Sequence, residues 1–211
     1  QIDLTSDVTG ELPVSNFATK DEDDMSSDSN THVPTQQSVK AYVDSEVSSV
    51  PVVIHQFMGY LASFTSGNYY YGHNTYGPYH HVWTNNLGSE PTTMNNFGAS
   101  RHGLFLHIVP ADLKNIGIKG YIQNGISGSN DVTIKVYKTT RPDGVAASNA
   151  TLGTAILSAS TGSMTHNTRG FNADDTSTAT VSAGEALVIL VVPTGTSTNI
   201  RFNYTLYGFA N

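Results

Sequence analysis

The sequence has no cysteine and few charged residues. Without cysteine there can be neither a disulfide nor a thiolate ligand for a metal, so stability has to come from burial or from assembly. Lys and Arg together number 10 in 211 residues, and the formal net charge is −7. Proteins that bind the phosphates of nucleic acids need clustered basic side chains, and the few basic residues here are spread along the chain, so nucleic acid is not an expected partner.

Long apolar runs are also missing. The longest, around residues 187–192, is far shorter than the roughly 20 apolar residues that a helix needs to cross a bilayer. We therefore expect no membrane insertion. The first residue is Gln1 rather than Met, which leads us to expect a piece of a longer or processed polypeptide.

The residues that are abundant favour strands and turns. The chain holds 22 Ser, 25 Thr, 17 Asn and 19 Gly. After Pro51, apolar and polar residues alternate with a period of two in the segments 116–122, 132–136 and 200–206, with turn signals between them. We therefore predict an all-β fold in which residues 52–211 form a jelly-roll-type β-sandwich of about eight or nine strands.

Two different segments precede this predicted sandwich. Residues 1–33 contain few apolar side chains and an acidic stretch at 21–24, which predicts an extended connector with a solvated bend. Residues 34–50 predict a short helix that Thr35 caps and that Pro51 stops.

One face of the predicted helix carries apolar side chains at helical spacing. Two turns of valine are too few to drive assembly alone, so the domain that follows must supply most of the association. The predicted contacts of a trimeric coiled coil are Val39, Tyr42, Val43 and Val47.

The stretch MSSDSNTHVPTQQSVKAYVDSEV resembles a recurrent segment of bacteriophage tail-fibre and related virion proteins. The upstream IDLTSDVTGELPVSNFA is similar to a segment found earlier in such fibres, although FATK replaces the usual Gly-rich continuation. More loosely, HGLFLHIVPADLKNIGIKGYI and SAGEALVILVVP are similar to β-sandwich domains of phage structural proteins. The closer resemblance covers residues 2–47 and implies a homotrimeric component of the virion, at the surface of the phage particle.

Such a fibre would contact other virion proteins through its N-terminal segment and a host cell-surface glycan or protein through its distal domain. One alternative is a capsid head fibre or decoration protein with a purely structural role. Another is a free carbohydrate-binding module, which should be a monomer with an exposed aromatic platform.

The segment GNYYYGHNTYGPYHHVWT concentrates aromatic and histidine side chains around three glycines. Aromatic faces with polar tips suit sugar rings and protein interfaces alike. These residues either contact the receptor or pack between subunits or over the end of the sandwich. The candidate receptor-binding residues are Tyr69, Tyr70, Tyr71, Tyr76, Tyr79 and Trp83.

Signals for catalysis and for metal binding are weak. The chain lacks a nucleophile elbow, a His-Glu-x-x-His helix and a phosphate-binding Gly-Lys-Ser/Thr loop, and acids are few after residue 51. The acidic stretch lacks the pattern of a calcium loop. We therefore expect no enzyme activity, no cofactor and no metal, although histidines with no recognised spacing stand at His73, His80, His81, His102 and His107.

Overall fold

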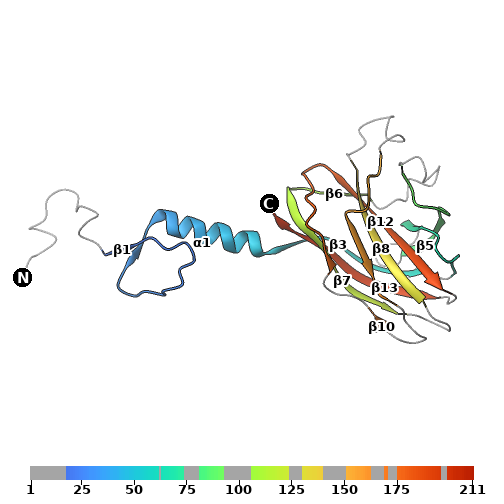
Figure 1. Cartoon of the computed structure of the whole chain (residues 1–211), viewed down its shortest axis with the longest axis horizontal. Coiled ribbons are helices and arrows are strands. Elements are labelled where there is room, and N and C mark those ends of the chain that lie inside the picture. The colour runs from blue at the N-terminus through green and yellow to red at the C-terminus, as the bar shows by residue number, and fades with distance from the viewer. Residues whose placement is uncertain are drawn as a thin grey trace, which may run out of the picture. The chain divides into compact units, whose positions relative to one another are not determined.

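The computed structural model describes residues 18–61, 63–73, 81–92, 106–123, 130–139, 151–162, 169–170, 175–195 and 199–211. The chain divides into two compact units, Gln1–Val50 and Pro51–Asn211. The first contains the helix and the second contains most of the strands (Figure 1).

The helix α1 spans Gln36–Ser49 and is capped as predicted. The backbone N–H of Ser38 donates to the Thr35 hydroxyl at 3.1 Å, which satisfies one of the donors left open at a helix N-terminus. At the other end Val50 has extended backbone, and its N–H donates to the Val47 carbonyl. Pro51 follows and lacks the N–H that a further turn would need.

The segment before the helix is folded back on itself. Strand β1 (Thr19–Lys20) pairs in parallel with β2 (Val33–Pro34), so the residues between them form a loop. Parallel pairing is possible because the chain travels out and returns over a dozen residues. The expectation of an extended connector is therefore wrong for residues 18–33, and residues 1–17 lie outside the described part of the chain.

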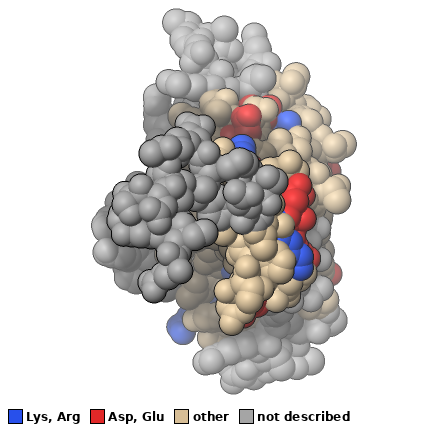
Figure 2. Space-filling model, turned by 90° about the vertical axis from the view of Figure 1, so that its left-hand side faces the viewer, with Lys and Arg blue, Asp and Glu red and all other residues tan. Residues whose placement is uncertain are grey.

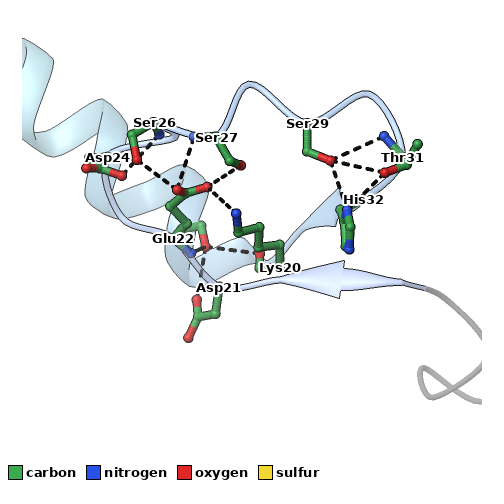
Figure 3. A network of polar contacts seen from close by, with 10 residues as sticks. Lys20, Asp21, Glu22, Asp24, Ser26, Ser27, Ser29, Thr31 and His32 are labelled. Atoms are coloured by element: carbon green, nitrogen blue, oxygen red, sulfur yellow. Dashed lines mark hydrogen bonds and ion pairs between the residues drawn. The ribbon is translucent and has the colours of Figure 1, made fainter.

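A network of polar contacts holds this loop. The Glu22 carboxylate accepts hydrogen bonds from Ser26 and from both the backbone and the hydroxyl of Ser27, and it pairs with Lys20 at 3.4 Å (Figure 3). These serine contacts lower the pKa of Glu22 to about 2. Part of the acidic stretch is therefore a structural bend held by hydroxyl donors, and sequence reasoning expected only a solvated one.

The same loop is tied to the start of the helix. The Asp21 carboxylate accepts hydrogen bonds from the hydroxyls of Thr35 at 2.6 Å and Ser38 at 2.9 Å, and the backbone N–H of Glu22 donates to Ser38 Oγ at 2.8 Å. Ser38 is fully buried. The hydrogen bonds from Thr35 and then Ser38 hold the pKa of Asp21 below its usual value.

The second unit is all-β, as the alternating pattern predicts. Its described strands form one mixed sheet of eleven strands. They are β3 (Pro51–Leu61), β4 (Tyr70–His73), β5 (His81–Asn86), β6 (Leu106–Ile108), β7 (Leu113–Gln123), β8 (Asn130–Thr139), β9 (Leu157–Ser160), β10 (Arg169–Gly170), β11 (Asp175–Thr176), β12 (Ala186–Gly195) and β13 (Ile200–Ala210).

Long-range antiparallel pairs build this sheet. Strand β13 lies between β3 and β7, and β12 pairs with β8 along ten residues. The strand order is β10-β7-β13-β3-β5-β4-β12-β8-β9, with β11 added at β7 and β6 at β12. Only the short contact between β3 and β5 is parallel within the described part of this sheet.

The sheet curves until its two ends approach each other. Strands β7 and β9 stand near opposite ends of the strand order, yet they are in contact. A single buried cluster contains residues from both ends, among them Ile118 of β7, Leu206 of β13 and Ile134 of β8. The alternation of apolar residues therefore marks the inner face, and β12 is buried on both faces over Ala186–Pro193.

The reason that β12 has no exposed face is a second, smaller cluster on the other side. It consists of Tyr137, Leu152, Val188 and Leu190, with Tyr69, Leu87 and Ala155 packed against it. Segments 87–92 and 151–156 thus cover the outer face of β8 and β12. The backbone N–H of Leu152 donates to the Thr92 carbonyl at 2.9 Å, which joins the two covering segments.

Candidate functional site

The helix presents an uncovered apolar stripe. Within one chain the exposed fractions are 42% for Val39, 39% for Tyr42, 48% for Val43 and 59% for Val47. A shallow depression of about 370 Å³ lies beside the first turns of this stripe, lined partly by Val39 and Val43. Four large apolar side chains on one face of a 14-residue helix stabilise it only when another surface covers them.

The aromatic segment supplies core residues as well as surface ones. Tyr70 is only 3% exposed and its hydroxyl accepts a hydrogen bond from the backbone N–H of Thr65, so it belongs to the core and the assignment as a receptor contact is corrected. Tyr69 is half-buried and reaches the outer face of β8. For Tyr71 in β4 and Trp83 in β5 the structure describes the backbone but not the side chain. Tyr76 and Tyr79 lie outside the described residues.

A polar cluster surrounds Lys135 on the outer face of β8. The ammonium group donates to the Tyr69 hydroxyl at 2.9 Å and to Glu90 Oε1 at 3.0 Å, and it lies 5.0 Å from the centre of the Tyr69 ring. The hydroxyl of Tyr137 also donates to Glu90 Oε1. One carboxylate oxygen thus receives two donors from neighbouring positions of one strand face, since residues 135 and 137 point to the same side.

This geometry holds both charged groups in their ionised forms. The hydrogen bond from Tyr137, and then that from Lys135, lowers the pKa of Glu90 against the opposing effect of burial. Burial alone would lower the pKa of Lys135, but the hydrogen bonds with Tyr69 and Glu90 outweigh it and raise that pKa. Burial, followed by the nearby Glu90, raises the pKa of Tyr137, so its hydroxyl remains a donor.

A groove of about 650 Å³ lies beside this cluster. Its walls come from the two covering segments and from the outward faces of β8 and β9. The lining residues are Glu90, Pro91, Thr92, Lys135, Leu152, Gly153, Thr154, Ala155 and Ser158. The groove therefore combines one carboxylate, one ammonium group, three hydroxyls and the apolar walls of Pro91 and Leu152.

Charge is sparse on the surface that Figure 2 shows. Acidic and basic residues form small separate patches there, and uncharged residues make up most of the described area. This distribution agrees with the low charged fraction of 13%, and the described residues of that face form no broad basic surface. No described helix is long and apolar enough to span a membrane.

The histidines named above are not gathered into a metal site in the described part of the chain. His107 on β6 stacks on His55 of β3 with 3.8 Å between ring centres, and the two rings are inclined by 31°. No group of three or more potential ligands occurs among the described residues. His73 and His81 lie on β4 and β5 without described side chains, and His80 and His102 fall outside the described residues.

Sequence reasoning missed the residues of the groove. Alternation places Lys135 on the polar face of a strand, with Tyr137 two positions further on the same face, and no sequence pattern singles out Glu90. The available signal was a lysine and a tyrosine two positions apart on one face of a strand. Such a pair can indicate that another segment covers this face and binds the two polar groups. The partner segment, however, lies about 45 residues away along the chain.

Comparison of the chain with family models, with curated proteins and with solved structures finds no match.

Proposed function

We propose that the chain is the C-terminal part of a bacteriophage virion fibre that assembles as a homotrimer and attaches to the host surface. The β-rich unit would be a jelly-roll-type sandwich, an arrangement supported by the curved sheet and by its long-range antiparallel pairs. The trimer and the virion location come from the resemblance of residues 2–47, and the fibre is a structural protein rather than an enzyme.

The observation that carries this proposal is the uncovered stripe on α1. A monomeric domain gains nothing from four apolar side chains that are each about 40–60% exposed on one helix face. In a homotrimer the same face meets its own copies around one axis, so a single repeated sequence buries all three stripes. Removal of this area from water is favourable by about 25 cal/mol for each Å².

Light scattering on the full chain across a dilution series tests the assembly. We expect a mass of three times the 22.6 kDa chain. The double variant Val43→Lys/Val47→Lys should dissociate at higher concentration than the wild type, because association would bury two ammonium groups in each chain. Gln37→Lys is the matched control, since Gln37 is exposed and lies about 160° around the helix from Val39.

A wild-type chain that stays monomeric at high concentration would contradict the fibre proposal. In that case the free carbohydrate-binding module is the better account, because it requires no partner copy. If the double variant dissociates at the same concentration as the wild type, the contacts that hold the trimer lie on the sandwich rather than on α1.

A further inference from the structure

The groove beside Lys135 has hydrogen-bonding capacity that the described residues do not fill. Glu90 Oε1 receives the donors of Lys135 and Tyr137, and Tyr69 also forms a hydrogen bond with this carboxylate. An ionised carboxylate has about four lone-pair sites, so these three described partners leave one of them open. An ammonium group has three donors, and described side chains engage two of those of Lys135. One acceptor and one donor therefore remain side by side at the edge of the groove.

This pair matches a hydroxyl group of a ligand. A hydroxyl accepts one hydrogen bond and donates another, so it can accept from Lys135 Nζ and donate to the Glu90 carboxylate at the same time. Both contacts would be charge-assisted, and those hydrogen bonds are about twice as strong as neutral ones. The anchoring by Tyr69 and Tyr137 fixes both groups before a ligand arrives, which lowers the cost of ordering them.

The rest of the groove favours an uncharged ligand with several hydroxyls. Among the described residues its lining carries one acid and one base, so the formal charge of this part is zero and it gives little preference to an anion or a cation. The hydroxyls of Thr154 and Ser158 are on exposed residues of the lining, and Pro91 and Leu152 add apolar walls. A volume of about 650 Å³ is in the range of small-ligand sites, which is roughly 300–1,000 Å³.

We propose that the groove between segments 90–92 and 152–158, with Glu90 and Lys135 at its edge, binds an uncharged saccharide. Sugar rings combine vicinal hydroxyls with an apolar C–H face, and the lining offers partners for both. The inference rests on the proposed function, because it names the chemical class of surface molecule that the distal unit would contact. It also moves the binding site from the predicted aromatic segment to a groove of which Tyr69 is only a support.

Saturation-transfer NMR on the full chain provides the test, with the methyl glycosides of glucose, galactose, mannose, N-acetylglucosamine and galacturonic acid as probes. We expect saturation transfer to at least one neutral glycoside. Ser158→Tyr should abolish it by filling the groove from the outward face of β9. Thr178→Tyr is the matched control, because Thr178 is exposed and does not line the groove.

Substitution of the polar pair should weaken binding without blocking the groove. Glu90→Gln and Lys135→Met should each raise the dissociation constant at least about tenfold, the usual effect of losing a charge-assisted hydrogen bond. Ser158→Tyr removes no described contact between protein side chains, so it keeps the test valid even if Glu90→Gln disturbs Tyr137.

Three results would overturn the inference: no transfer to any glycoside, transfer that Ser158→Tyr leaves unchanged, or tighter binding of galacturonate than of its neutral counterpart. The mass of the same samples separates the two proposals. A trimer that binds no glycoside contradicts the groove alone. A monomer that binds a neutral glycoside through the groove contradicts the fibre and supports the groove.

Discussion

Among the glycines whose surroundings the structure describes, Gly120 is the one where a single added carbon should do most damage to the β-rich unit. It lies on β7 opposite Tyr204 of β13. A Cβ atom at Gly120 would stand 2.0 Å from the carbonyl oxygen of Asn203 and 2.5 Å from the Cα atom of Tyr204. Carbon and oxygen atoms of neighbouring strands ordinarily approach to about 3.3 Å, so the strands would have to separate by about 1 Å.

The size of the effect follows from what has to move. Overpacking of a core usually costs about 1–3 kcal/mol, when side chains can adjust. Here both obstacles are backbone atoms of β13, which is held by β3 on its other side. We therefore expect Gly120→Ala to lower the free energy of unfolding by about 3 kcal/mol or more, a large part of the roughly 5–15 kcal/mol typical of a domain.

Urea unfolding followed by tryptophan fluorescence measures this change in the β-rich unit alone, because Trp83 is the only tryptophan and lies on β5. All variants are compared at one protein concentration, so that association affects them equally. Gly153→Ala is the control, since no atom of the described residues lies within 4 Å of a Cβ placed there, and its midpoint should stay close to that of the wild type. Equal midpoints for Gly120→Ala and Gly153→Ala would refute the packing of β7 against β13.

Two further predictions concern the polar networks. Glu22 has its pKa lowered to about 2 in the folded loop, so its contribution to loop stability is complete above the unfolded value near 4.5 and is lost as the pH falls through about 2. The protection of the Ser26 and Ser27 amides, taken as the exchange rate relative to that of an unfolded peptide at the same pH, should fall over that window, and Glu22→Gln should remove this pH dependence; protection that does not change between pH 5 and 2 would contradict it. Tyr137→Phe should cost about 1–2 kcal/mol by removing the donor to Glu90, measured by urea unfolding. The control is the same substitution in a Glu90→Ala chain, where the loss should be smaller; equal losses would show that the Glu90 contact adds nothing.

Local pattern was enough to predict the strands and the helix. Alternation placed Ile118 and Ile134 on the inner face, and a hydroxyl before a run of helix formers identified Thr35 as the cap. Both signals act over a few residues, because side-chain direction in a strand and donor satisfaction at a helix start are local properties.

The sequence could not indicate which outer faces are covered. Tyr137 alternates with buried residues and so should face solvent, yet it is 1% exposed because Leu152 packs beside it. That packing depends on a segment that returns from elsewhere along the chain, and periodicity carries no information about it. The same limitation hid the groove, whose charged residues come from a covering segment and a strand that pair only in three dimensions.

The folded loop before α1 was missed for a related reason, since its energy comes from polar rather than apolar groups. A count of apolar side chains finds too few for a core, but Asp21, Glu22 and Ser38 satisfy one another through hydrogen bonds instead. These hydrogen bonds fix the first turn of the helix at Thr35 within a single chain. If the apolar stripe that begins at Val39 packs against the same stripe of other copies, the helix is already ordered and loses less conformational entropy on association. This favours assembly through a helix that would be marginal by itself.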